Sequence, residues 1–224
     1  MTTASLQKPP PGALAAAARP WPAPQAGLRL VRLHLASRRL PSGLAVLAGC
    51  GAALWAALHW HWTVGSGTGA QSIPVILEAG TAAVIAVTIH SPFGEPERAT
   101  GRWLPYLRLG TTMALAAAAA GALATGAAIA GGLDGGILDL LRNVAGLTGI
   151  GLLLATVTGG GLAWTGPMAY VVVAEYAIVQ SWTTPWVWPA RPPHDRGAAI
   201  CAALVFGAGI VVVTLRGARD SARD

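Results

Sequence analysis

Four long intervals of the sequence contain no Asp, Glu, Lys or Arg, and each is long enough to cross a lipid bilayer. They lie between Arg39 and Glu78, Arg108 and Asp134, Arg142 and Glu175, and Arg196 and Arg216. An α-helix needs about 20 consecutive apolar residues to cross the hydrocarbon core. Only 11% of the residues are charged and 54% are hydrophobic, proportions unlike those of ordinary soluble domains. We therefore expect a membrane protein.

The apolar segments predict an all-α polytopic fold with six transmembrane helices. These helices are expected at residues 43–64, 73–91, 107–131, 138–163, 166–184 and 197–215. The second and fifth carry a central carboxylate, Glu78 and Glu175 respectively, which lowers their hydropathy. Because ionisable groups inside a membrane usually face protein, both side chains are expected to point into the bundle. A count of only four helices would leave too much apolar surface without a partner.

The basic residues predict the orientation of the six helices. Six crossings place both termini on one side, and Arg142, Arg191 and Arg196 are then the only three of the 15 Lys and Arg residues on the other. Because cytoplasmic loops are enriched in Lys and Arg, both termini are expected in the cytoplasm. The chain is thus expected to be a multi-pass protein of the plasma membrane, in bacteria the inner membrane. Its net charge of +6 reflects this topology, and no nucleic-acid partner is expected.

Composition divides the chain into four parts. Residues 1–27, rich in Pro and Ala, are expected to form a disordered cytoplasmic tail, and residues 28–42 a basic connecting segment. The transmembrane domain then spans 43–215, and 216–224 form a basic tail. Within this basic segment, LRLVRLHLASRRL has a weak amphipathic pattern. It is either an interfacial or partner-binding helix or a basic flank that sets topology.

Motifs for catalysis or metal binding are missing from the sequence. It contains no GxxxxGK[ST] loop, and because Lys8 is its only lysine the chain cannot be a P-loop ATPase by itself. It has no GxSxG elbow and no HExxH helix, so an enzyme is not expected. Cys50 and Cys201 fall within predicted helices and are interpreted as core residues rather than as a disulfide or zinc site.

Histidine and tryptophan alternate at the outer end of the first predicted helix, in ALHWHWTV. His59 and His61 alternate there with Trp60 and Trp62. Amphipathic rings favour the membrane–water interface, so an aromatic belt is the preferred interpretation. A metal or haem site is the alternative.

The segment LDLLRNVAGLTGIGLLLATVTGGG, residues 138–161, combines a polar start with an apolar body. Asp139, Arg142 and Asn143 are candidates, with Glu78 and Glu175, for polar groups of the bundle interior or of a transport pathway. Arg142 either anchors the helix at the lipid headgroups or pairs with a carboxylate, of which Asp139 is one helical turn away. Small residues that allow close helix packing follow, and those selected are Gly146, Gly149 and Gly159.

A longer stretch, DLLRNVAGLTGIGLLLATVTGGGLAWTGPMAY, resembles the membrane subunits of ABC-2 type transporters, in particular small actinobacterial permeases. The residues that carry the resemblance are Arg142, Asn143, Gly146, Gly149, Gly161, Ala163, Trp164 and Pro167. Six helices with cytoplasmic ends and a basic segment before the first helix are similar to the same group.

The resemblance implies an ATP-driven transporter, expected to be an exporter, in which two membrane subunits pair and separate ATPase subunits bind ATP and Mg²⁺. This chain would then hold no cofactor. The loop 90–105 would couple the subunits, and it offers Glu95, Glu97, Arg98 and Arg102 to the ATPase. A plain hydrophilic turn is the alternative for this loop. Residues 182–197 resemble in position a re-entrant element between the last two helices.

Two other functions remain open at the level of sequence. One is a membrane scaffold or receptor-like protein that transports nothing. The other is a secondary transporter that uses Glu78 and Glu175 as proton sites, in which case transport would depend on the proton gradient rather than on ATP.

Overall fold

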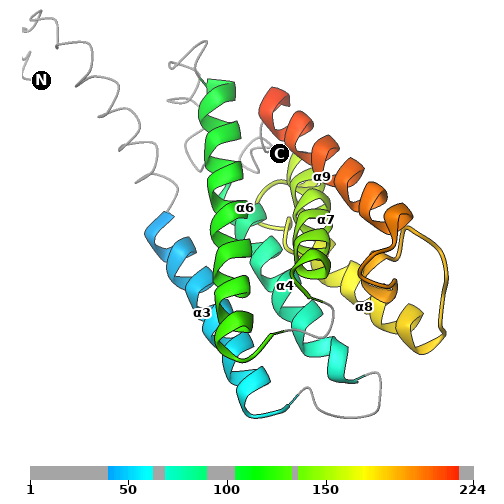
Figure 1. The fold of residues 1–224 in the computed structure, drawn as a ribbon. Coiled ribbons are helices and arrows are strands. Elements are labelled where there is room, and N and C mark those ends of the chain that lie inside the picture. Colours follow the sequence, from blue (N-terminus) through cyan, green and yellow to red (C-terminus); the bar gives the residue numbers. More distant parts are fainter. Residues whose placement is uncertain (1–39, 63–68, 90–103, 133–135, 217–224) are drawn as a thin grey trace, which may run out of the picture. The chain divides into compact units, whose positions relative to one another are not determined.

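The computed structural model describes residues 40–62, 69–89, 104–132 and 136–216. Within these ranges the secondary structure is helical throughout (Figure 1). The elements are α3 (Leu40–His59), α4 (Gly69–Thr88), α6 (Leu104–Ile129), α7 (Gly136–Thr158), α8 (Thr165–Val179), the short 3₁₀-helix η2 (Trp188–Ala190) and α9 (Arg196–Arg216). The predicted terminal tails, most of the basic segment and the coupling residues Glu95, Glu97, Arg98 and Arg102 lie outside the described residues.

Among the described residues, four of the six α-helices are long and apolar enough to cross a membrane. These are α3, α6, α7 and α9, judged by length and composition. The apolar part of α4, Ser72–Thr88, and all of α8 are shorter. Each of the six predicted segments therefore contains a helix, and four of these helices have the length of a membrane span.

Helices α3, α6 and α8 all end in the same hydrogen-bonded turn. At the end of α8, the Ser181 N–H donates to the Ile178 carbonyl and the Trp182 N–H to the Ala177 carbonyl. This is a Schellman motif, in which one residue adopts a left-handed backbone conformation. In α8 that residue is Ser181, with φ of 53°, and in α3 it is His61, with φ of 55°. The motif ends both helices before residues 64 and 184, where the sequence predicted their ends.

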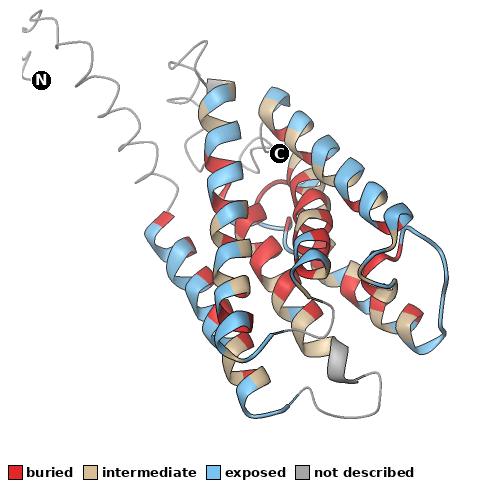
Figure 2. Ribbon diagram, in the orientation of Figure 1, coloured by how far each residue is buried: buried red, intermediate tan, exposed pale blue. Residues whose placement is uncertain are grey.

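Helix α7 is the centre of the bundle. It packs against α4, α6, α8 and α9, and it is the most buried of the four candidate spans. Buried residues concentrate on α4 and α7, whereas α3, α6 and α9 expose one side (Figure 2). The exposed side chains on those three helices include many large hydrophobic ones, among them Leu44, Val46, Met113, Ile200, Leu204, Val211 and Leu215.

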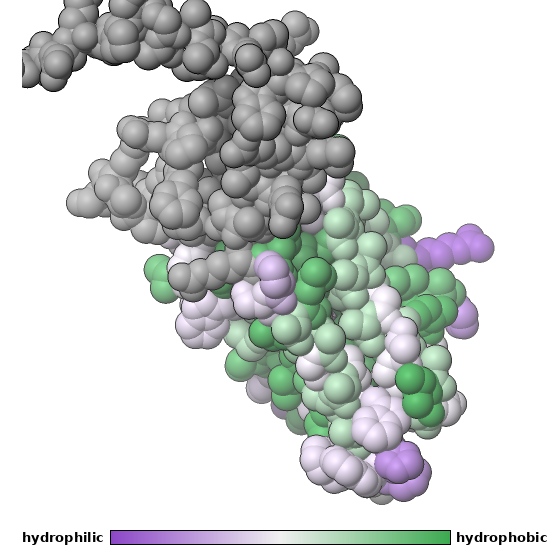
Figure 3. All heavy atoms as spheres, turned by 90° about the vertical axis from the view of Figure 1, so that its left-hand side faces the viewer, coloured by the Kyte–Doolittle hydropathy of each residue, from purple (hydrophilic) through white to green (hydrophobic). Residues whose placement is uncertain are grey.

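An apolar exterior is what contact with lipid requires. Most of the described surface that faces the viewer in Figure 3 is coloured as hydrophobic. Because lipid tails are as apolar as these side chains, the hydrophobic effect does not separate outer from inner faces as it does in water. Close packing and polar contacts therefore decide which faces of the helices meet.

Glycines permit the closest helix contacts. A Cβ atom on Gly149 of α7 would lie 2.6 Å from the Phe206 backbone nitrogen of α9. On the α9 side, a Cβ on Gly209 would lie 2.8 Å from the Gly149 carbonyl oxygen. In the α3–α6 pair, a Cβ on Gly51 would lie 2.5 Å from the Ala122 carbonyl oxygen. No side chain fits at these distances, so the backbones touch directly, as small-residue packing in membranes predicts.

Gly159 has a different position from the one expected. Helix α7 ends at Thr158 rather than at residue 163, and Gly159 follows it with φ of 84°. A left-handed residue directly after a helix ends it, and glycine adopts this conformation without steric strain. Gly159 therefore lies in the turn between α7 and α8 and not on a helix face.

Candidate functional site: a polar cluster and the segment packed over it

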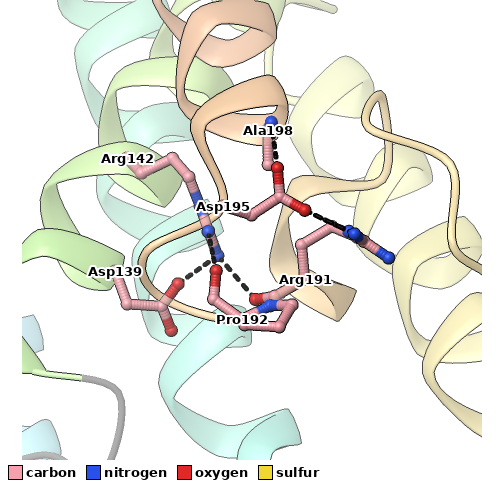
Figure 4. A network of polar contacts seen from close by, with 6 residues as sticks. All are labelled: Asp139, Arg142, Arg191, Pro192, Asp195 and Ala198. Atoms are coloured by element: carbon pink, nitrogen blue, oxygen red, sulfur yellow. Dashed lines mark hydrogen bonds and ion pairs between the residues drawn. The ribbon is translucent and has the colours of Figure 1, made fainter.

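Arg142 is the centre of a buried polar cluster at the end of the bundle where α7 and α9 begin. Its side chain is only 4% exposed. Nη1 donates to the Pro192 carbonyl at 2.8 Å, and Nη2 donates to the Arg191 carbonyl at 3.1 Å. Nη2 also forms an ion pair with Asp139 (Figure 4). The guanidinium thus joins α7 to the connecting segment, which we define as residues 181–195 between α8 and α9.

Prolines limit the regular backbone hydrogen bonding of the connecting segment, and Arg142 adds side-chain hydrogen bonds to it. Pro192 and Pro193 lack a backbone N–H, so this stretch cannot form a regular helix or strand ladder. The Pro192 carbonyl still accepts one backbone hydrogen bond, from the Asp195 N–H at 3.0 Å, and a carbonyl oxygen can accept a second one. Arg142 supplies two of its N–H groups, and an arginine suits the role because its planar fork holds several donors in a rigid geometry.

The predicted pair of Asp139 and Arg142 is present in the structure. Asp139 lies in the first turn of α7, where a negative charge meets the positive end of the helix dipole. Its side chain is 25% exposed, so water reaches part of the pair. Pairing of Arg142 with Glu78 or Glu175, the alternative in the sequence, is not seen among the described residues. The simple headgroup anchor is not seen either, because the guanidinium is buried.

A second ion pair holds the far end of the connecting segment. Arg191 donates through Nε to Oδ2 of Asp195 at 2.6 Å. The other carboxylate oxygen, Oδ1, accepts the Ala198 N–H at 3.1 Å and so caps the N-terminus of α9. The Ala198 N–H first, and the Arg191 guanidinium second, lower the pKa of Asp195 below its ordinary value. Both interactions favour the charged carboxylate.

Trp188 fills a notch on α7. Its side chain is 2% exposed, and a Cβ on Gly146 would lie 2.5 Å from the indole ring. Tyr170 of α8 stacks on the same ring with 4.6 Å between centroids, and its hydroxyl donates to the Trp186 carbonyl at 2.7 Å. Gly146, selected for helix packing, thus receives an aromatic ring of the connecting segment instead of a neighbouring helix.

Glu78 of α4 and Asn143 of α7 lie together in the interior. They are 3% and 2% exposed respectively, and the Asn143 side chain is a hydrogen-bonding partner of the Glu78 carboxyl group. Glu78 Oε2 and Asn143 Oδ1 have no partner among the described residues. Asn143 is adjacent in sequence to Arg142, so this pair and the arginine cluster belong to the same part of α7.

Glu175 of α8 is tied to α4 at a different level. The Ser72 hydroxyl donates to Glu175 Oε2 at 2.5 Å, while Oε1 is buried and has no partner in the described part of the chain. Ser72 and Glu78 are six residues apart on α4, a rise of about 9 Å. The structure therefore brings each glutamate to a polar partner on another helix, but it does not bring the two glutamates together.

The remaining candidates form no site of their own in the described ranges. Cys50 and Cys201 are free thiols. His59 stacks on Trp55 with 5.3 Å between ring centroids, and Trp60 and Trp62 are exposed. No group of three or more potential metal ligands occurs among the described residues.

Sequence reasoning missed the contacts of the connecting segment. Trp188 packs against Gly146 of α7 and Tyr170 bonds to the Trp186 carbonyl, and no periodic pattern indicates either contact. One local signal was available: Asp195 stands three residues before Ala198 at the start of an apolar run, as an N-cap does. Comparisons of the chain with protein-family models, curated proteins and solved structures found no match.

Proposed function

We propose that the chain is the membrane subunit of a transporter, with six membrane helices, both termini in the cytoplasm and the connecting segment as a re-entrant element on the outer side. The observation that carries the proposal is the set of polar groups buried inside the apolar bundle. Polar groups at such positions are costly and usually belong to a substrate or ion pathway. Glu78, Asn143 and Glu175 are the pathway residues in this proposal.

ATP is the proposed energy source, and a separate subunit hydrolyses it. Support comes from the resemblance of residues 139–170 to ABC-2 type membrane subunits and from the missing P-loop. In this proposal two membrane subunits pair and export a substrate by alternating access. Residues 90–105 transmit the movement of the ATPase.

Purification tests the ATP-driven proposal directly. The full-length chain, tagged after Asp224, is isolated from its native membranes and its partners are identified by mass spectrometry. A P-loop ATPase in stoichiometric amount is expected, with ATP hydrolysis in the purified complex. Replacing Glu97 and Arg98 by Ala should weaken this association, whereas Arg196→Ala, an exposed arginine on the proposed outer side, serves as the matched control. A chain that is fully folded and carries no ATPase would contradict the proposal.

A proton-coupled transporter is the second candidate, and the burial of Glu78 favours it. The Glu78 carboxyl group has no ion-pair partner in the described structure, and a buried carboxyl group without a cation is a common element of proton relays. Purified protein in liposomes with an imposed pH gradient distinguishes the candidates. Proton flux without ATP that is lost in Glu78→Gln and retained in Asp224→Asn supports this candidate. Absence of flux in the unaltered protein rejects it.

A further inference from the structure

The connecting segment is attached to the bundle by a small number of separate contacts. Its stretch 186–192 is held by the Tyr170 hydroxyl, by the Trp188 ring in the Gly146 notch, by the Arg142 guanidinium and by Val187, which packs in a cluster with Ala174 and Ala177 of α8. Only three residues of the segment, η2, form a helix. A segment that lacks a hydrogen-bonded ladder can detach as a unit when these few contacts are lost.

Two of the groups that hold the segment are incompletely satisfied. Arg142 Nε and Trp188 Nε1 are buried donors without a hydrogen-bond partner in the described part of the chain. A buried donor without a partner destabilises the arrangement that buries it. The packed position of the segment is therefore less stable than its close packing alone would indicate, and exposure to water would satisfy both donors.

The segment packs against the part of α7 that contributes Arg142 and Asn143 to the buried polar groups. Gly146, which receives Trp188, is one helical turn from Asn143 and Arg142. Asn143 in turn contacts Glu78. Removal of Trp188 from its notch would uncover this side of α7 at the end of the bundle where the helix begins.

We propose that residues 186–192 form a movable gate over the polar interior, with Arg142 as its latch and the Trp188 ring as the part that closes the Gly146 notch. The inference rests on the proposed transport function, because it identifies what must move for the interior to become accessible. In the structure the gate is closed. Opening breaks the two Arg142–carbonyl hydrogen bonds and withdraws Trp188, while α7 and α9 keep their direct contact at Gly149.

A native thiol reports on this movement. Cys201 of α9 packs against the cluster of Trp188, Ala198 and Ala202, so its reaction with a charged, membrane-impermeant maleimide should follow the population of the open gate. Cys50→Ala removes the other cysteine. The labelling rate is measured by mass spectrometry on the full-length chain in lipid nanodiscs, well below the unfolding temperature of each variant.

Two variants open the gate in different ways. Arg142→Gln removes the latch and should raise the labelling rate by about tenfold or more, since hydrogen bonds from a charged donor are lost. Gly146→Ala leaves the latch but places a methyl group 2.5 Å from the Trp188 ring, and it should have the same effect. The matched controls are Arg216→Gln, at the other end of α9, and Gly121→Ala, where a Cβ meets no atom within 4 Å. Both controls should label at the unaltered rate.

The outcomes decide the proposal without reference to a substrate or an ATPase. Unchanged labelling in both Arg142→Gln and Gly146→Ala, with unchanged helix content, overturns the gate. Should either variant fail to fold, hydrogen exchange in the unaltered chain decides the matter: amides at 187–191 must exchange much faster than those in the middle of α7, and equal protection overturns the gate. Failure of the transport proposal alone would leave these rates as expected.

Discussion

Replacing Arg142 by alanine tests how far its buried polar contacts stabilise the fold. The substitution removes the ion pair with Asp139 and both hydrogen bonds to the carbonyls of Arg191 and Pro192. Breaking a buried ion pair typically costs about 3–5 kcal/mol. Because Asp139 is 25% exposed and water can solvate the remaining carboxylate, the lower end applies, about 3 kcal/mol. For a chain of this size the unfolding temperature should fall by about 6–12 °C.

The assay is thermal unfolding followed by the intrinsic fluorescence of the nine tryptophans. Asp139→Asn keeps both carbonyl hydrogen bonds of Arg142, but it leaves the 4% exposed guanidinium without its counter-ion, so it should also lower stability by about 3 kcal/mol. Arg142→Lys should lose most of the stability, since a lysine cannot reproduce the fork geometry. In the double variant with Arg142→Ala, the effect of Asp139→Asn should vanish or reverse in sign, because no unpaired charge remains.

A fall of less than about 2 °C in both Arg142→Ala and Arg142→Lys would refute the reasoning, because it corresponds to less than about 1 kcal/mol. Arg216→Ala is the control, since this arginine is exposed at the end of α9. It should unfold at the temperature of the unaltered protein.

Three further predictions concern other parts of the structure. Gly126→Ala should destabilise the α3–α6 contact by about 1–3 kcal/mol, because its Cβ would overlap the Gly51 carbonyl oxygen; Gly121→Ala should not, and thermal unfolding compares the two. The interactions that lower the pKa of Asp195 stabilise the fold at pH values above the ordinary carboxyl pKa, and this stabilisation should be lost as the pH falls through the lowered pKa. A pH series of unfolding temperatures should show this loss in the unaltered chain and a weaker loss in Asp195→Asn. Glu78→Gln should leave stability unchanged or raise it, because it removes a buried ionisable group without an ion-pair partner, whereas Glu78→Lys should prevent folding in a detergent solubility assay.

The sequence predicted the helices well because their signal is local. Long charge-free intervals, such as 197–215, correspond to helices that begin and end near the flanking charges, as α9 does between Arg196 and Arg216. The pair of Asp139 and Arg142 was also predictable, because residues three apart on a helix share a face. The burial of Glu78 followed from the high cost of exposing a carboxyl group to lipid.

The contacts of the connecting segment could not be predicted in the same way. Arg142 bonds to carbonyls 49 and 50 residues away in the sequence, and no periodicity encodes a contact with a backbone oxygen. The end of α8 was also unpredictable, because Ser181 occupies a left-handed position that glycine usually takes. A run of apolar residues continues the pattern of a helix even where the backbone has already turned.

In the proposed six-helix topology, the shortness of α8 has a consequence for the surrounding lipid. Its 15 residues give a length of about 22 Å, whereas the hydrocarbon core of a typical bilayer is about 30 Å thick. If α8 crosses the membrane as proposed, the bilayer beside it must become thinner, or the connecting segment must occupy the missing depth. Such a mismatch makes a membrane protein sensitive to acyl-chain length, so shorter lipids should stabilise this chain and longer ones should strain the end of the bundle that holds Arg142.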